Sequence, residues 1–339
     1  MVNTSNHTIS MAQKYIQEIK IPEAFQPTNI TKDYYLDMIE KAADAYQKEE
    51  LEERTQKFTT DIVEDIHAYS RLTSIIAVLL SNNRKPEYKD LWIKMMDVCC
   101  RDVSKITEGV MPDFAVKEIM LAYKAMSGRV TEEKRNQWLS GLKKVDPYIN
   151  YGLVYTKTDV LHNINVFNMS GEYLRETEGL TDTTDYYDKH WPLQYKNFDC
   201  NGMYIDPGAP MLYDIATRVH IQLILNNGYH GKYKTKLDDY LKHAGYTTLF
   251  MQSSANQLPF GGRSNQYQFN EALIAANCEY EASRYKQLGD LKTAGVYKRS
   301  AHLAVQSIAR WLNDNPPRHI KNFYPAESKF GTEDYGYYD

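Results

Sequence analysis

The sequence predicts an all-α fold, and three observations favour it. About a dozen stretches carry apolar residues at helical spacing, and Gly, Pro or polar turn residues separate them. No stretch shows the sustained alternation of a strand or the rhythm of βαβ units. The loops between successive helices are short, which favours antiparallel neighbours. We therefore expect an (α/α) toroid, in which about six helical hairpins close into a ring.

Turn residues and helix-start signals place each expected helix. Pro22 stops the first helix, and the segment 82–86 separates the third helix from the fourth. Thr131 followed by two glutamates is typical of a helix start, because acidic residues there favour the helix dipole. Two prolines at 316–317 stop the last helix. The expected helices cover residues 10–19, 31–54, 61–80, 87–106, 112–126, 131–144, 159–179, 183–198, 211–227, 232–250, 265–288 and 291–313.

We expect residues 1–9 to be disordered and residues 10–339 to form one toroid domain. An open solenoid is the competing arrangement, but its repeats usually share a motif and none is visible here. In a toroid, the loops at one end of the inner helices surround a central cavity. The irregular polar loops expected at that end are 148–158, 199–210, 251–264 and 323–339.

The composition argues against several classes of function. The chain has 339 residues, 42% of them hydrophobic, which is enough for a large core. Its net charge of −4 gives no basic footprint for nucleic acid, and no apolar run approaches the roughly 20 residues of a membrane span. None of the four cysteines has Cys-x-x-Cys spacing, so we expect buried free thiols and no zinc site.

The first residues lack the apolar region of a signal peptide. We therefore expect a cytoplasmic protein, or a periplasmic or extracellular one if a signal peptide has been removed. Tyrosine is abundant, with 28 residues against 10 phenylalanines. Its apolar ring and polar hydroxyl suit a half-hydrated sugar-binding cleft, although helix packing near the surface would also account for many tyrosines.

The chain is organised around residues 201–271, where two turn-rich loops each lead into a helix. Residues 201–214 contain Pro-Gly-Ala-Pro, and residues 259–271 contain Gly-Gly-Arg-Ser. Both loops crowd polar residues where a helix begins, and backbone N–H groups there point outward at any anion. Ordinary capping explains some of these residues, but their density exceeds what capping needs. We therefore interpret the two loops as parts of a binding site.

In the first loop we expect Tyr204, Asp206, Tyr213 and Asp214 to project toward the cavity. Known catalytic motifs do not identify the chemistry. The sequence has no His-Glu-x-x-His and no Gly-x-Ser-x-Gly, so a zinc protease or a serine hydrolase is not supported.

In the second loop, the glycines at 261–262 let the backbone approach a ligand closely. Arg263 offers a planar fork that suits a carboxylate, with a surface ion pair as the alternative. Gln266, Asn270 and Glu271 follow on the helix, and the first two are neighbours one turn apart.

A third polar segment covers residues 159–172. His162 and Asn165 share one face of the expected helix, and Asn163 shares another with Phe167. Buried amides must find partners, so several of them in an apolar pattern are unusual. Both a substrate-facing role and a core histidine bonded to a neighbouring carbonyl are consistent with this pattern.

His67 lies close in sequence to Asp61, Glu64 and Asp65. These residue types could hold a metal ion. An exposed charged helix face is the favoured interpretation, and we expect no metal.

These segments together resemble the (α/α)-toroid polysaccharide lyases and related uronide-acting enzymes. The resemblance covers about residues 160–271. Its first motif is Asn-Gly-Met-Tyr-Ile-Asp, which precedes a helix whose first turn carries a Tyr. Its second motif is the later Gly-Gly-Arg-Ser-Asn-Gln, which is also similar to gut-bacterial glycan-degrading proteins. It implies a catalytic Tyr at Tyr213, an Arg at Arg263 and an Asn/His pair at Asn163 and His162. The loop His of the family pattern is absent, and Asp206 with the following Pro stands in its place.

The resemblance implies an enzyme that degrades uronic-acid-containing glycans, a polysaccharide lyase acting by β-elimination without a cofactor. We expect the toroid alone, without the β-sandwich that often follows it in such enzymes. The expected catalytic residues are Tyr213, Arg263, His162, Asn163 and Glu271, and the expected substrate-binding residues are Tyr204, Asp206, Asp214, Gln266, Asn270 and Asn165.

Two alternatives stay open at this point. A glycoside hydrolase would need two carboxyl groups across the scissile bond. The carboxyl candidates for it are Asp206, Asp214, Glu271, Glu333 and Asp334. A non-catalytic glycan-binding protein or helical scaffold would instead place Arg263, Tyr213 and Glu271 on separate surfaces or in ordinary packing.

Overall fold

The structure, a computed structural model, describes residues 2–20, 27–155, 161–259, 262, 264–265, 267–314, 317–318 and 321. Within these ranges the chain contains 15 α-helices and four short 3-10 helices, and no strand. An isolated antiparallel bridge joins Phe198 to Tyr204. The predicted all-α class is therefore confirmed, and the toroid stays a prediction.

The chain forms two compact units. Unit 1 holds the described residues up to 38 and from 193 onward, and unit 2 holds those from 39 to 192. Helices α2 (Lys32–Asp44) and α11 (Thr184–Gln194) each contribute residues to both units. The single domain expected over residues 10–339 likewise stays a prediction.

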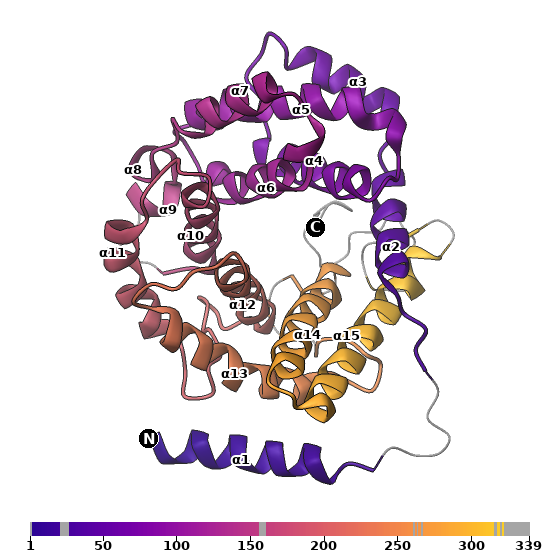
Figure 1. Ribbon diagram of the computed structural model, residues 1–339, viewed down its shortest axis with the longest axis vertical. Coiled ribbons are helices and arrows are strands. Elements are labelled where there is room, and N and C mark those ends of the chain that lie inside the picture. The colour runs from indigo at the N-terminus through magenta and orange to yellow at the C-terminus, as the bar shows by residue number, and fades with distance from the viewer. Residues whose placement is uncertain are drawn as a thin grey trace. The chain divides into compact units, whose positions relative to one another are not determined.

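In unit 2, α6 (Met111–Met126) packs against both α4 (Ile66–Ser81) and α10 (Asn163–Glu176) (Figure 1). A Cβ atom at Gly171 of α10 would lie 3.1 Å from the backbone nitrogen of Lys117 on α6, so glycine permits this close approach. Its helices are α3 (Lys48–Lys57), α4 (Ile66–Ser81), α5 (Lys89–Asp102), α6 (Met111–Met126), α7 (Glu132–Leu142), α8 (Pro147–Asn150), α9 (Gly152–Tyr155) and α10 (Asn163–Glu176), with 3-10 turns at Pro86–Tyr88, Val103–Lys105 and Ser127–Arg129.

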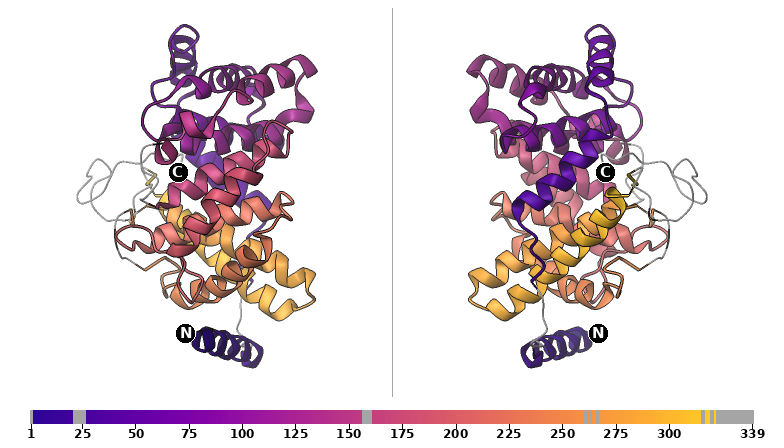
Figure 2. Two further views of the ribbon diagram at one scale, coloured as in Figure 1. Left: turned by 90° about the vertical axis from the view of Figure 1, so that its left-hand side faces the viewer. Right: turned by 90° about the vertical axis from the view of Figure 1, so that its right-hand side faces the viewer.

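Unit 1 is built on an antiparallel pair, α14 and α15, with α12 against α14 (Figure 1). Helix α1 lies beside α15, and the two side views show it next to the orange and yellow helices (Figure 2). The helices of this unit are α1 (Val2–Glu18), α12 (Met211–Asn226), α13 (Lys234–Met251), α14 (Phe269–Gln287) and α15 (Leu291–Leu312), with a 3-10 turn at Tyr195–Asn197.

Aromatic residues fill much of each core. In unit 2 the rings of Trp92 and Trp138 meet edge to face at 5.4 Å between centroids, which fixes α5 against α7. In unit 1 the rings of Tyr285 and Tyr297 stack at 5.6 Å, and the hydroxyls of Tyr285 and Tyr246 lie 2.8 Å apart. For these tyrosines helix packing, and not a sugar-binding cleft, is the role that the contacts support.

The helix expected over residues 31–54 is two helices, because the chain breaks between α2 and α3. Gln47 has extended backbone angles and precedes a first turn that carries Glu49 and Glu50. Acidic residues stabilise a helix N-terminus, so the Lys-Glu-Glu segment starts a new helix where the apolar pattern alone suggests a continuous one.

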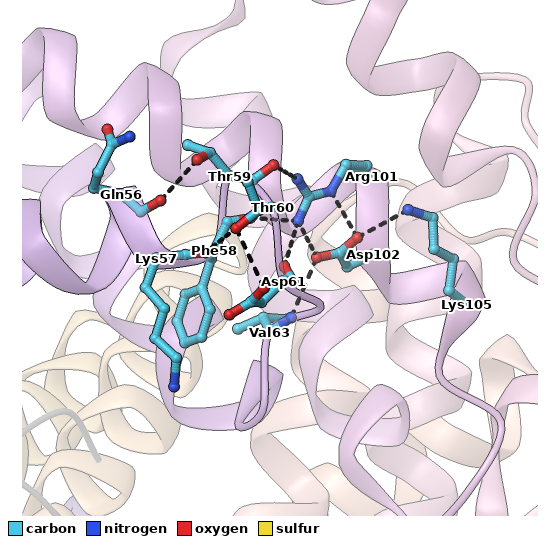
Figure 3. Close-up of polar contacts among 10 residues, drawn as sticks. All are labelled: Gln56, Lys57, Phe58, Thr59, Thr60, Asp61, Val63, Arg101, Asp102 and Lys105. Carbon is cyan, nitrogen blue, oxygen red and sulfur yellow. Dashed lines mark hydrogen bonds and ion pairs between the residues drawn. The ribbon is translucent and has the colours of Figure 1, made fainter.

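The helix expected from residue 61 begins five residues later, at Ile66, because side chains hold the preceding loop in place. Arg101 on α5 donates to the carbonyl oxygens of Phe58, Thr59 and Asp61 at 2.6–3.0 Å (Figure 3). Asp102, which is fully buried, binds the same guanidinium and accepts from the backbone N–H of Val63. A guanidinium with three carbonyls and a carboxylate has its donors well satisfied, so this contact is structural.

Three further observations concern the ends and the surface. Helix α1 begins at Val2, within the segment expected to lack structure. Cys200 is exposed, so the expectation of a buried thiol is wrong for it, whereas Cys99, Cys100 and Cys278 are buried. Among the described residues, none of the helices combines the length and the apolar character that crossing a membrane requires.

Candidate functional site

The start of helix α14 in unit 1 gathers an unusual number of buried polar side chains. Its first turn carries Glu271, where an acidic group favours the helix dipole. Each member of the set is at most 9% exposed. We call this set the α14 polar cluster, and it consists of Ser264, Asn265, Gln268, Asn270, Glu271 and Lys321.

The centre of the α14 polar cluster is a buried ion pair. Lys321 Nζ lies 2.7 Å from Glu271 Oε1, and the side chains are 1% and 0% exposed. The same carboxylate oxygen accepts a hydrogen bond from the backbone N–H of Leu258 at 3.0 Å. Burial raises the pKa of Glu271 and lowers the pKa of Lys321, and in each case the partner's charge opposes the shift.

Several atoms beside this pair have no hydrogen-bond partner among the described residues. They are the Nδ2 and Oδ1 atoms of Asn270, the Oε2 atom of Glu271, the Oε1 atom of Gln268 and the Oδ1 atom of Asn265. A buried polar atom without a partner costs about 1–3 kcal/mol, and folded proteins hold few of them. Such a concentration indicates a place where a ligand or ordered water supplies the missing bonds.

Tyr213, in the first turn of α12, connects the two loops predicted to form the site. Its hydroxyl lies 3.0 Å from Ser264 Oγ, and its side chain is only partly buried. Ser264 has a left-handed backbone angle, φ 65°, and Gly262 has φ 90°. A Cβ atom at Gly262 would lie 2.7 Å from Pro210 Cβ, so only glycine permits this contact between the two loops. The two loops therefore touch at Tyr213, Ser264 and Gly262, and their role as a binding site stays a prediction.

The other residues of the first loop make contacts within unit 1. Asp214 accepts from both Nε and Nη2 of Arg218, at 3.1 and 2.7 Å, and from the backbone N–H of Tyr204. The Tyr204 hydroxyl donates to Gln194 at 2.6 Å, and Asp206 is 1% exposed. These contacts hold the loop on α12, and the substrate-binding role expected for the three residues stays a prediction.

The predicted residues at the start of α10 lie in unit 2. Asn165 Oδ1 accepts from the backbone N–H of His162 at 2.9 Å, which satisfies a donor at the helix N-terminus. Asn163 is 2% exposed, and its neighbour one turn on is Phe167. Asn165 therefore caps its own helix, and the catalytic roles expected for His162 and Asn163 stay predictions.

Sequence reasoning missed two buried networks in unit 2. Asp113 accepts from Asn168 Nδ2 at 3.0 Å and from the Gly152 N–H at 2.8 Å, and Asn168 Oδ1 accepts from the Tyr186 hydroxyl at 2.7 Å. Burial raises the pKa of Asp113 to about 7. The sequence signal for it was misleading, because an Asp in the first turn of a helix is usually an exposed favourable charge.

The second network joins Glu172 to two partners. Arg175 Nη1 lies 2.6 and 2.7 Å from the two oxygens of Glu172, and the Tyr151 hydroxyl donates to the same carboxylate at 2.6 Å. Arg175 Nη2 donates to the carbonyl oxygen of Val145 at 2.8 Å. Each charged group has a partner of opposite charge, so the network binds α10 to the loop before α8.

Several predicted residues lie outside the described part of the chain. They are Arg263, Gln266, Glu333 and Asp334, together with Gly261. The carboxylates that a glycoside hydrolase would use include Asp214 and Glu271, and each of these is already bound to a buried cation. Nothing in the described contacts favours a facing pair of carboxyl groups.

His67 is not on an exposed charged face as expected. Its ring stacks on Phe114 at 4.4 Å between centroids, and its neighbours Asp65 and Glu64 bind the Ala68 N–H and Lys57 instead. In the described ranges no group of three His, Cys, Asp or Glu residues could hold a metal ion.

A hollow of about 700 Å³ on unit 2 is lined by residues of both charges. None of the predicted site residues lines it, and its composition is that of a solvated surface. The lining residues are Lys48, Glu52, Glu53, Gln56, Glu87, Asp90, Leu91 and Lys94.

Comparison with models of protein families, with curated proteins and with solved structures finds no match for this chain. The function is therefore argued from the α14 polar cluster and the residues around it.

Proposed function

We propose that this protein is a carbohydrate-active enzyme that degrades uronic-acid-containing glycans, and that it acts as a polysaccharide lyase by β-elimination. The observation that carries the proposal is the contact between the Tyr213 hydroxyl and Ser264, 3.0 Å apart. This phenol is partly exposed, and the serine that it contacts follows Arg263 in the sequence. Tyr204, Asp214 and Glu271 are fully buried and already bound within unit 1.

β-Elimination on a uronide removes the proton next to the carboxylate and breaks the bond to the glycosidic oxygen on the adjacent carbon. A carbon–carbon double bond forms, and the leaving oxygen takes up a proton. Charge builds on the carboxylate oxygens during the first step, so a fixed cation or amide beside them lowers the barrier. Tyr213 would transfer the proton, and Arg263 would stabilise the carboxylate.

The α14 polar cluster supports a sugar as the substrate. Asn270 presents an amide donor and an amide acceptor that have no partner among the described residues, and sugar hydroxyls can satisfy both. Gln268 Oε1 and Asn265 Oδ1 add two further acceptors. Several buried amides that lack partners would suit a ligand rich in hydroxyl groups, such as a glycan.

The proposal includes the (α/α) toroid. Short loops between antiparallel helices are the basis for this arrangement. An experimental structure of the full chain tests it, and two units that do not close into a ring would contradict it.

The test is turnover on a panel of uronate polysaccharides, followed by the near-ultraviolet absorbance of the unsaturated product. Tyr213→Phe is expected to lower turnover at least about 100-fold, since it removes the group that transfers the proton. Tyr246→Phe is the matched control, because it also removes one hydroxyl that contacts another hydroxyl, here that of Tyr285. Full turnover by Tyr213→Phe contradicts its role, saturated products would indicate a hydrolase, and no turnover on any substrate would leave a glycan-binding protein.

A further inference from the structure

A second group of charged and aromatic side chains lies on helices α4, α6 and α10 of unit 2, outside the loops that the sequence analysis selected. Lys117 and Glu118 come from α6, together with Phe114 one turn earlier. His67 and Arg71 are one turn apart on α4, and Phe167 is on α10. We call these six residues the Lys117 cluster.

The charges of the Lys117 cluster are close together and largely removed from water. Lys117 Nζ lies 2.6 Å from Glu118 Oε1, and Arg71 Nε lies 4.0 Å from the same oxygen. The side chains of Lys117, Glu118 and Arg71 are 11%, 12% and 14% exposed. Within this set of six described residues, two cations therefore share one carboxylate, while a small part of each charged side chain remains accessible.

Apolar rings surround these charges. Lys117 Nζ lies 5.0 Å from the centre of the Phe167 ring, and the Phe114 ring meets that ring edge to face at 5.1 Å. Rings of this kind exclude water and lower the local dielectric constant, so a charge brought to Lys117 interacts more strongly than it would in solvent. The ammonium also has donors beyond the one directed at Glu118.

His67 provides a second, independent observation. Its Nε2 atom is buried and has no hydrogen-bond partner among the described residues. Burial, with Arg71 and Lys117 nearby, lowers the pKa of His67 to about 2, so the ring is neutral and adds no charge. An unsatisfied ring nitrogen beside an excess of positive charge indicates a ligand that is anionic and also carries hydrogen-bonding groups.

We propose that the Lys117 cluster binds the carboxylate of an acidic sugar, with Lys117 as the main contact and His67 bonded to a neighbouring hydroxyl. This inference rests on the proposed function for the choice of a uronate, and it assigns binding residues that sequence analysis did not find. Glu118 competes with the ligand for Lys117 and keeps the empty cluster from holding two buried cations without a carboxylate.

The experiment measures, by calorimetry, binding of tetrasaccharides of galacturonate and of hyaluronan, with neutral maltotetraose as the comparison. Lys117→Met is expected to weaken binding of an acidic tetrasaccharide at least about tenfold, because it removes the cation that pairs with the carboxylate. Glu118→Gln is expected to strengthen the same binding several-fold, because the competing charge is gone. Lys124→Met is the matched control on the same helix, since Lys124 is paired with Glu178 at 2.8 Å outside the cluster, and it is expected to change nothing.

The two substitutions separate a binding role from a structural one. A cluster that only stabilises the fold would lose stability in both variants, and neither would change the affinity of folded protein; that result overturns the inference. Equal binding of acidic and neutral tetrasaccharides by the unsubstituted protein overturns it as well. If acidic sugars bind in a Lys117-dependent way but no unsaturated product forms, the inference holds and the lyase proposal fails. If product forms with a KM that Lys117→Met does not change, the lyase proposal holds and this inference fails.

Discussion

Two regions of the molecule bury polar side chains to the same extent but differ in how fully those side chains are hydrogen-bonded. In unit 2, Asp113, Asn168 and Glu172 are at most 1% exposed, and described donors or acceptors satisfy their side chains. In unit 1, Asn270 and Glu271 are equally buried, yet both side-chain atoms of Asn270 and one oxygen of Glu271 have no described partner.

This difference separates polar groups that build the fold from polar groups that are available to a ligand. A satisfied buried network contributes rigidity and has no remaining capacity for binding. A buried network with unpaired polar atoms lowers the stability of the free protein, and a ligand that forms the missing hydrogen bonds restores that stability. We therefore expect substitutions in the two regions to have opposite effects on stability, and the following experiments test this.

The largest effect is expected from Arg175→Met in unit 2. It leaves the Glu172 carboxylate buried without its cation and removes the donor to the Val145 carbonyl oxygen. Removing one member of a buried ion pair costs about 3–5 kcal/mol. Urea unfolding measures the loss. Lys124→Met, which breaks a pair that is 27% and 25% exposed, is the control and should cost less than about 1 kcal/mol. A similar small loss for Arg175→Met would contradict a structural role for this network.

The sharpest comparison is between two asparagines that are both 0% exposed. Asn168→Leu removes the partners of Asp113 and Tyr186 and is expected to cost about 1–3 kcal/mol. Asn270→Leu removes a side chain that has no described partner and is expected to stabilise the free protein by about 1 kcal/mol while weakening glycan binding. Unfolding in urea and calorimetry measure the two effects. Equal destabilisation by both substitutions would mean that Asn270 is also structural.

Periodicity and breakers predicted much of the fold, because amphipathic helices and their stop signals are local. The helices expected at 211–227 and 291–313 are observed as Met211–Asn226 and Leu291–Leu312. The prediction failed at residues 61–65, where the chain is held by Arg101, about 40 residues further along. No local pattern identifies such a contact.

The candidate site was predictable to a similar extent and for the same reason. Tyr213, Asn270 and Glu271 stand beside turn residues and helix starts, which a sequence displays directly. Lys321 follows Glu271 by 50 residues in a segment without a clear period, so its pairing could only be seen in three dimensions. In the sequence, Lys117 looks like any polar residue of an amphipathic helix. Its neighbours on α4 and α10 are far away along the chain and are brought to it only by the fold.

The smallest expected effect is a difference in pH dependence. Burial raises the pKa of Asp113 from its ordinary value of 3.8 to about 7. The folded protein therefore keeps this proton up to about pH 7, whereas the unfolded chain releases it near pH 4. Unfolding releases a proton between these values, so this group makes stability fall as pH rises through the window and has no further effect above it.

Asp113→Asn removes this titration, so the unsubstituted protein should lose stability relative to the variant by about 1 kcal/mol between pH 5 and pH 6. Glu281→Gln is the matched variant in unit 1, because burial raises the pKa of Glu281 to about 7 as well, with Arg284 Nε 3.3 Å from its Oε2. Urea unfolding at the two pH values measures both differences, and carboxylates common to all three proteins cancel. If the unsubstituted protein keeps or gains stability relative to Asp113→Asn between pH 5 and pH 6, Asp113 is ionised in the folded protein. The hydrogen bonds that Asp113 accepts from Asn168 and Gly152 would then lower its pKa by more than burial raises it.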